Sequence, residues 1–302
     1  MLRRSLLALS ESRPLRHWME QSATAQRFTS RFIAGRTLAD EVEVVRQLAA
    51  ERMLATLDFL GENVTSIEEA QASQSNYLAA FEPIQPYGGT VSIKLTQFGL
   101  DLSREVCVRN VRALVACAER YDTRVEVDME SSAYTARTIE IVEELNREFP
   151  GRVRVAIQAY LYRSEADVSA LSQQGIPVRL CKGAYHEPAS IAYPQKADVD
   201  ANYVKLTRLL LRNGTYPAIA GHDDAMIAAA LGFVREQNIA PERFEFQMLY
   251  GIRRDLQRDL VAKGHRVRLY VPYGNAWFPY FMRRLAERPA NLLFIARNLV
   301  RR

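Results

Sequence analysis

The sequence predicts an α/β protein with a TIM-like (β/α)8 barrel, and three observations support this fold class. From about residue 50 onward, short apolar runs rich in β-branched residues alternate with segments of helical periodicity. There are eight such runs, the strand number of this barrel, and they span about 250 residues, its usual length. The first strand-to-helix turn, Leu60-Gly61-Glu62-Asn63, lacks the Gly-x-Gly-x-x-Gly pattern of the alternative, a doubly wound open sheet.

The expected elements follow one another along the chain. Residues 1–50 form a helical arm, in which Thr37 is expected to cap a helix over residues 38–52, and residues 51–302 form the barrel, giving one structural domain overall. Strands are expected over residues 54–60, 90–95, 124–129, 153–159, 177–182, 216–222, 244–249 and 267–271. Helices are expected over residues 106–121, 135–149, 165–174, 201–212, 224–237 and 254–263. Because strands alternate with helices, we expect parallel pairing through right-handed crossovers.

Composition and spacing exclude several classes of function. The formal charge is +5, but Lys and Arg are interleaved with Asp and Glu, so nucleic-acid binding is not indicated. No run reaches the roughly 20 apolar residues of a membrane span. The histidines and cysteines match no metal-site spacing, and there is no Gly-x-Ser-x-Gly turn, so a metal centre and acyl transfer are not expected. Three unpaired cysteines fit a reducing compartment.

Polar groups recur near one end of nearly every expected strand. In this barrel the active site lies at the carboxyl ends of the strands. A lone strand lysine usually faces outward, and a lone histidine is usually structural. A ring of such groups in apolar runs instead indicates mutual pairing around a polar ligand, because an unpaired buried charge costs several kcal/mol. The ring consists of Glu62, Lys94, Asp128, Gln158, Arg179, Lys182, His222, Gln247 and Tyr270.

A last helix is expected to begin near Pro279. On it, Tyr280, Arg283, Arg284 and Glu287 are three or four residues apart and therefore share one face. Adjacent arginines just past a strand end are typical of a receptor for a small anion. The alternative is a solvated helix face with an intrahelical Arg–Glu pair.

Taken together, these residues resemble a known family, the short monofunctional bacterial proline dehydrogenases. The resemblance extends from about residue 26 to about residue 297. Its motifs, in the family's order, are Thr-Leu-Asp-Phe-Leu-Gly-Glu (56–62), Ser-Ile-Lys-Leu-Thr (92–96), Val-Asp-Met-Glu (127–130), Arg-Leu-Cys-Lys-Gly-Ala-Tyr (179–185), Gly-His-Asp (221–223), Phe-Gln-Met-Leu-Tyr-Gly (246–251) and a tail over 270–289 that contains Tyr-Val-Pro-Tyr-Gly and Arg-Arg-Leu-Ala-Glu-Arg-Pro.

The resemblance implies a distorted barrel with FAD over the strand ends and the last helix across the mouth. The implied reaction oxidises L-proline to Δ1-pyrroline-5-carboxylate, the first step of proline catabolism, with quinone as electron acceptor and pyrroline-5-carboxylate dehydrogenase as the downstream enzyme. Such a protein is cytoplasmic or lies peripherally on the inner face of the cell membrane. By position, Lys94, Arg283 and Arg284 would bind the proline carboxylate.

The resemblance also assigns roles to further residues. Asp128 would orient Tyr270 and the cationic cluster, and Glu62 would close a gate by pairing with Arg283. The wall around the proline ring would be Leu249, Tyr270 and Tyr280. The expected cofactor contacts are Gln158, Arg179, Lys182, Gly183, Ala184, His222, Gln247 and Glu287.

Two departures and two alternatives accompany this interpretation. Gly221 stands where the family often has Thr, and His186 stands where a related enzyme can place an aromatic residue on the adenosine side of the cofactor.

The alternative enzyme is a flavin barrel resembling methylenetetrahydrofolate reductase, and the alternative from another class is a catalytically silent barrel that binds a ligand or a membrane. The adjacent arginines of the last helix disfavour the reductase, and the complete set of charged positions disfavours the silent barrel.

Overall fold

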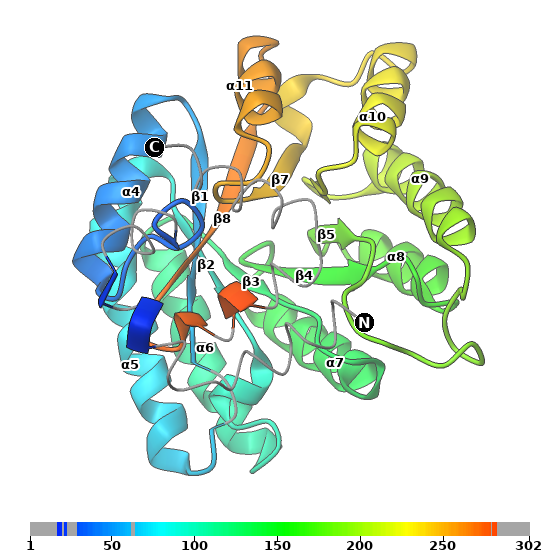
Figure 1. Ribbon diagram of the computed structural model, residues 1–302. Coiled ribbons are helices and arrows are strands. Elements are labelled where there is room, and N and C mark those ends of the chain that lie inside the picture. Colours follow the sequence, from blue (N-terminus) through cyan, green and yellow to red (C-terminus); the bar gives the residue numbers. More distant parts are fainter. Residues whose placement is uncertain (1–16, 20, 23–28, 62–63, 279, 283–302) are drawn as a thin grey trace.

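The strands close into a barrel. The computed structural model describes residues 17–19, 21–22, 29–61, 64–278 and 280–282 of the chain. Eight parallel strands pair in chain order, and β8 pairs back onto β1 (Figure 1). The strands are β1 Leu54–Phe59, β2 Thr90–Ile93, β3 Val125–Val127, β4 Val153–Gln158, β5 Val178–Cys181, β6 Ala218–Ala220, β7 Glu245–Leu249 and β8 Val267–Tyr273. The predicted (β/α)8 fold class is confirmed.

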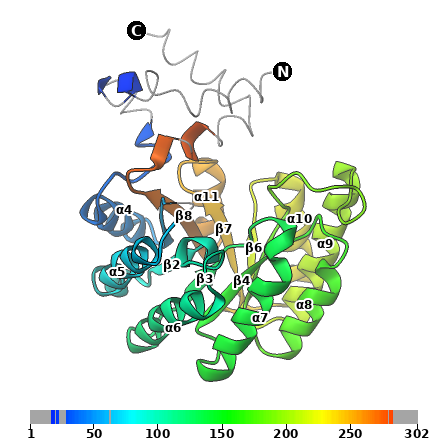
Figure 2. The same cartoon turned by 90° about the horizontal axis from the view of Figure 1, so that it is seen from below.

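Helices surround the strands (Figure 2). They are α4 Leu38–Ala50, α5 Ile67–Ile84, α6 Arg104–Arg120, α7 Ser132–Glu148, α8 Ser164–Gln173, α9 Lys196–Asn213, α10 Asp224–Glu236 and α11 Arg254–Ala262. Short 3-10 helices are η1 Gln85–Tyr87, η2 Leu95–Phe98 and η3 Pro241–Arg243. Helix α5 has no counterpart among the helices expected from periodicity, because small and polar residues such as Ala70, Ser73 and Ala80 form much of its buried face.

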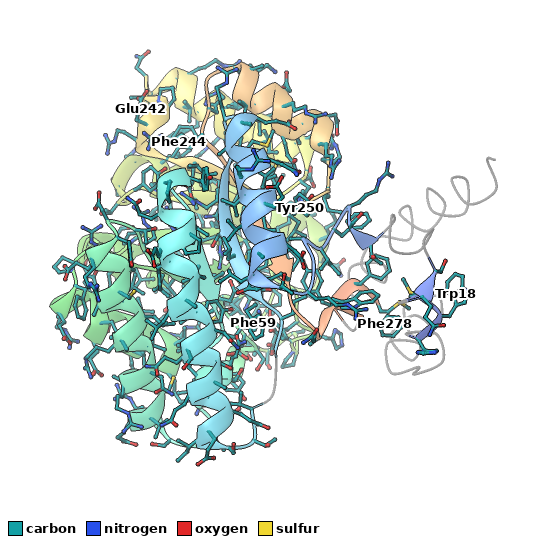
Figure 3. All side chains as sticks on the ribbon, turned by 90° about the vertical axis from the view of Figure 1, so that its left-hand side faces the viewer. Trp18, Phe59, Glu242, Phe244, Tyr250 and Phe278 are labelled. Carbon is teal, nitrogen blue, oxygen red and sulfur yellow. The ribbon has the colours of Figure 1, made fainter. Side chains whose placement is uncertain are left out.

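Helix α4, which precedes the barrel, packs against both β1 and β8 (Figure 1). Its predicted cap is present: the Thr37 hydroxyl accepts from the Asp40 N–H at 3.2 Å, and the Asp40 carboxylate accepts from the Thr37 N–H at 3.0 Å. The chain segment after β8 contributes Phe278 beyond the strand ends, on the opposite side from Phe244, which precedes β7 (Figure 3). Helix α4 therefore covers the barrel wall where β8 meets β1. The segment after β8, by contrast, lies beyond the strand ends.

The interior of the barrel is charged, whereas TIM barrels usually fill theirs with branched apolar side chains. Arg154 of β4 lies between two acids, with Nη1 2.9 Å from Glu126 Oε1 of β3 and 2.5 Å from Glu245 Oε1 of β7. Arg268 of β8 places Nε 3.0 Å from the same Glu245 oxygen. All four side chains are buried. We call Glu126, Arg154, Glu245 and Arg268 the interior charge layer.

Glu41 of α4 carries a buried carboxyl group. Its side chain is fully buried, and neither carboxyl oxygen has a hydrogen-bond partner among the described residues. Burial, with a further contribution from Asp58, raises the pKa of Glu41 well above its usual value. The folded state therefore holds this proton more tightly than the unfolded state does.

A stability difference between pH 5 and pH 8 is expected from Glu41. Its contribution is complete below the unfolded-state pKa of about 4.3 and is lost as the pH rises through the folded-state pKa. Glu41→Leu is therefore expected to raise the free energy of unfolding relative to the parent, and by more at pH 8 than at pH 5. Urea denaturation at the two pH values measures this, and an equal effect at both would mean that Glu41 does not hold a proton.

No helix in the described part of the chain combines the length and the apolar character that crossing a bilayer requires.

Candidate active site

Most of the site residues that the sequence predicted lie together at the carboxyl ends of the strands. Lys94 follows β2 directly, and Asp128 follows β3. The expectation that Lys94 lies within a strand is corrected: β2 ends at Ile93 because η2 begins at Leu95, and Lys94 is the extended residue between them. Asp128 is half-buried and remains hydrogen-bonded to the β2 backbone through its N–H, 2.8 Å from Ile93 O.

Asp128 is the acceptor on which this cluster converges. Its carboxylate accepts from the Tyr270 hydroxyl at 2.7 Å and the Ser92 hydroxyl at 2.9 Å, and it also pairs with the Arg179 guanidinium. Lys94 Nζ lies 3.4 Å from Asp128 Oδ2, the oxygen that accepts from Tyr270. Burial alone would raise the pKa of Asp128, but Arg179 and Lys94 outweigh burial and hold the pKa below its usual value. Asp128 is therefore ionised and saturated with donors.

A second acid, Asp58 of β1, lies on the other side of Lys94. Its Oδ1 is 3.3 Å from Lys94 Nζ, and its side chain is 1% exposed. Burial raises the pKa of Asp58, and Lys94 opposes that rise. Sequence reasoning did not single out Asp58. The sequence did contain one signal for it: Asp58 is a polar residue two positions after the polar Thr56, and residues two apart in a strand face the same side of the sheet.

Arg179 joins the mouth of the barrel to its interior. Its Nη2 donates to Asp128 and to Ser92 Oγ at 3.2 Å, while its Nη1 lies 3.3 Å from Glu126 Oε2. The guanidinium carbon is 5.7 Å from the centre of the Tyr270 ring. The Gln247 amide oxygen accepts from Nη1 at 3.4 Å. Arg179 is thus held from both sides in one orientation.

Gln247 belongs with this interior group. Its amide nitrogen donates to Glu126 Oε2 at 2.9 Å and to Glu245 Oε1 at 2.8 Å, and its side chain is buried. Its expected contact with a cofactor stays a prediction.

The ends of β4, β5 and β6 bring together a second set of polar groups. The Gln158 amide donates to Glu130 O at 3.0 Å and accepts from the Ala184 N–H at 3.3 Å. The Lys182 ammonium pairs with Asp200 and with Asp223, the latter at 3.0 Å. His222 Nε2 accepts from the Leu249 N–H at 2.8 Å, which leaves the proton of a neutral ring on Nδ1.

Gly183 lies between these groups with a φ of +123°. A Cβ atom at this position would stand 2.3 Å from the Tyr160 ring, so only glycine fits. By contrast, a Cβ at Gly221 would meet the Tyr203 hydroxyl at 3.5 Å, an ordinary contact. The space around position 221 therefore does not require glycine there in place of the threonine that is frequent in the family.

Several predicted site residues lie outside the described residues, namely Glu62, Arg283, Arg284 and Glu287. Tyr280 is described and lies in a second apolar cluster with Leu60, Trp277 and Phe281. Leu249 is the last residue of β7, next to the rim. Of the four residues predicted to share a face of the last helix, Tyr280 is thus the one within the described residues.

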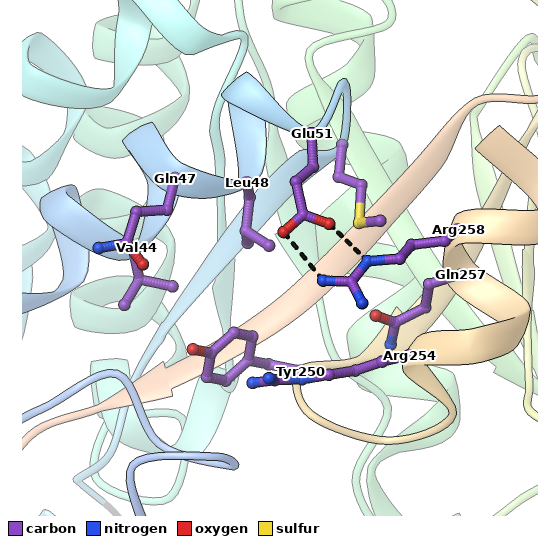
Figure 4. Close-up of a pocket in the computed structure, with 9 residues that line it drawn as sticks. Val44, Gln47, Leu48, Glu51, Tyr250, Arg254, Gln257 and Arg258 are labelled. Carbon is purple, nitrogen blue, oxygen red and sulfur yellow. Dashed lines mark hydrogen bonds and ion pairs between the residues drawn. The ribbon is translucent and has the colours of Figure 1, made fainter. Parts of the chain in front are cut away.

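A hollow of about 100 Å³ lies on the outer wall between α4 and α11 (Figure 4). Glu51 and Arg258 pair across it, with Arg258 Nε 2.8 Å from Glu51 Oε2. Its other lining residues include Tyr250, Arg254 and Gln257. None of the predicted site residues within the described part of the chain lines it, so it is separate from the cluster at the strand ends.

The fold and this cluster define a (β/α)8-barrel enzyme whose candidate active site lies at the carboxyl ends of the strands. A family model for proline dehydrogenase matches residues 42–297. The chain belongs to the proline dehydrogenase family, whose members are oxidoreductases.

Individual relatives agree with this membership. Proline dehydrogenase 1 of Bacillus subtilis is 39% identical, covering 100% of both chains. Proline dehydrogenase of Deinococcus radiodurans is 37% identical, covering 99% of this chain and 98% of that protein. Among solved structures, proline utilization A of Bdellovibrio bacteriovorus, inactivated by N-propargylglycine, superposes with a TM-score of 0.81 at 28% identity. That match covers 87% of this chain and 33% of the other.

Proposed function

We propose that this protein catalyses the FAD-dependent oxidation of L-proline to Δ1-pyrroline-5-carboxylate and passes the electrons to a quinone. One observation supports this most directly: Asp128 contacts Lys94, Tyr270 and Arg179 in a single partly buried cluster at the barrel mouth. The family membership gives the reaction class, and the cluster would bind an amino acid carboxylate next to a polar cofactor.

The substrate side of the site would use residues on β1–β3 and β8. Lys94, with Arg283 and Arg284, would bind the proline carboxylate, since an ammonium and two guanidinium groups complement a carboxylate. Asp128 would keep Lys94 and Tyr270 in position. The wall around the ring would be Leu249, Tyr270 and Tyr280, with Glu62 as the gate.

The residues on the ends of β4–β6 fit a flavin nucleotide by the chemistry of their donors. Gln158, Arg179, Lys182 and His222 all carry N–H groups at one side of the mouth, which suits phosphates and an electron-rich ring. The left-handed Gly183 exposes backbone next to them. Ala184, Gln247 and Glu287 complete the proposed contacts. When bound, FAD supplies the two-electron acceptor for the substrate.

The chain's own contribution is orientation and charge. Lys94 and the arginines would hold the substrate by its carboxylate so that the ring is turned toward the cofactor side. Arg179, kept charged and oriented by Asp128 and Glu126, would supply positive charge beside the acceptor. Asp128 links the two sides, because it touches both Lys94 and Arg179.

Anaerobic titration with L-proline tests this function. The purified protein is expected to be yellow, and L-proline is expected to bleach the flavin absorbance. A colourless protein would support the silent barrel, and bleaching by NAD(P)H without bleaching by proline would support the reductase. Hydroxyproline in a parallel titration reports whether Tyr280 crowds the substrate ring.

The quinone acceptor implies contact with a membrane. We propose a cytoplasmic protein that associates peripherally with the inner face of the cell membrane, as one structural domain made of the arm (1–50) and the barrel (51–302). Its product would be consumed by pyrroline-5-carboxylate dehydrogenase.

A further inference from the structure

Asp58 differs from Asp128 in how its charge is balanced. Asp128 accepts from Arg179, Tyr270 and Ser92 in addition to Lys94. Among the described residues Asp58 forms one ion pair, with Lys94 at 3.3 Å, and its buried Oδ2 has no hydrogen-bond partner. The ionised form of Asp58 therefore depends chiefly on Lys94, with a smaller contribution from Tyr270, because an uncompensated buried carboxylate is strongly disfavoured.

Binding of a substrate carboxylate changes that balance. Lys94 Nζ already lies between two carboxylates, at 3.3 and 3.4 Å. A third carboxylate on the same ammonium adds negative charge within a few ångströms of Asp58, and like charges at that distance favour protonation of one of them. Contact with Arg179 keeps the proton affinity of Asp128 low. Asp58, by contrast, contacts no second cation among the described residues.

We propose that Asp58 is the proton acceptor of the site: when the substrate carboxylate docks on Lys94, Asp58 takes up the proton that the substrate ammonium must lose. The N–H bond of the ammonium breaks, an O–H bond forms on the Asp58 carboxylate, and no electrons are exchanged in this step. The amine is left neutral, so its lone pair is available when the adjacent C–H bond is oxidised. The inference rests on the proposed function, because it needs an amino acid substrate at Lys94.

The other titratable groups around Asp58 are less suited to accept this proton. They are Lys94, Asp128, Tyr270, Glu41, Tyr77 and Tyr273. Lys94 is needed as a cation, and Asp128 is held ionised by Arg179. The buried Glu41 has no donor to stabilise a charge and so already carries a proton. The three tyrosines are protonated at neutral pH, with pKa values raised by burial.

Calorimetry with a substrate analogue tests the inference without turnover. Tetrahydrofuran-2-carboxylate has the shape and carboxylate of proline but a ring oxygen in place of the ammonium, so Asp58 must draw its proton from the buffer. Titration of the flavin-loaded protein in phosphate and in Tris, whose ionisation enthalpies differ, is expected to show uptake of about one proton per analogue bound. Binding without uptake would overturn the inference and leave the proposed function intact, whereas no binding together with no bleaching by proline would overturn both.

Asp58→Asn isolates the residue, with Glu41→Gln as the matched control because Glu41 is a buried acid near Asp58 that does not contact Lys94. We expect the Asn variant to bind the analogue without proton uptake and the control to behave as the parent. With proline, the Asn variant is expected to lose about 100-fold in kcat/KM near pH 7, a usual size for loss of a proton acceptor. The loss should shrink as the pH approaches the pKa of the amine, because the substrate then arrives neutral. Unchanged uptake, or a loss that is the same at every pH, would contradict the assignment.

Discussion

Replacing Arg154 by methionine is expected to lower the free energy of unfolding by about 3–5 kcal/mol. Arg154 is fully buried and contacts both acids of the interior charge layer, at 2.9 Å from Glu126 and 2.5 Å from Glu245. Its Nη2 also donates to Tyr216 O at 3.1 Å. Methionine fills similar space but leaves two buried carboxylates with reduced compensation, and that desolvation cost is larger than the gain from a well-packed apolar side chain.

Equilibrium denaturation in urea measures this change, and Arg258→Met is the matched control. Arg258 makes a bidentate pair with Glu51, at 2.8 and 3.1 Å, but both side chains are about half-exposed. Such exposed pairs contribute about 0–1 kcal/mol. If both variants lost less than about 1 kcal/mol, the interior charge layer would not be a major source of stability.

Replacing Asp128 by asparagine is expected to lower kcat/KM for L-proline by about 100- to 1000-fold. The amide has nearly the shape of the carboxylate but lacks its charge, and it presents an NH2 group to donors. Arg179, Tyr270 and Lys94 then lose the acceptor that orients them. Charge-assisted contacts of this kind contribute about 1.5–3 kcal/mol each, and about 1.4 kcal/mol corresponds to a tenfold rate change.

Steady-state kinetics with proline under identical flavin loading measures the effect. Asp122→Asn is the control, because Asp122 pairs with Arg152 at 2.7 Å with its side chain 88% exposed, and it is expected to change kcat/KM less than twofold. The loss in the Asp128 variant should appear in both kcat and KM, since the residue contacts the proposed substrate ligand Lys94 and the cofactor-side Arg179. A variant with kinetics like the control would show that Asp128 does not organise the site.

The barrel and part of its site could be predicted from local patterns. Strand-like and helix-like runs alternate, and this alternation is a property of neighbouring residues, so the strand count is readable without contacts. The convergence of Lys94, Asp128 and Arg179 followed from a single rule, that the carboxyl ends of parallel strands meet at one edge. Helix α5 was not expected because its buried face has little apolar contrast.

The interior charge layer and Asp58 were not predicted. A charged residue within an apolar run is ambiguous, since the same alternation permits an inward or an outward orientation. Glu126 and Gln247 are 121 positions apart in the chain but hydrogen-bonded in the fold. Their pairing depends on barrel closure and strand stagger, which local sequence does not specify.

The sequence by itself determined the alternation of strands and helices, the turns that end them and the polar residue types near the strand ends. Each of these follows from dihedral preferences and apolar spacing over a few residues. Only the tertiary structure decided which charges pair. Asp128 accepts from several donors, whereas the ion pair of Asp58 is with Lys94. This difference arises from strand register and burial in the closed barrel, because the energy of a charge depends on all of its neighbours in space.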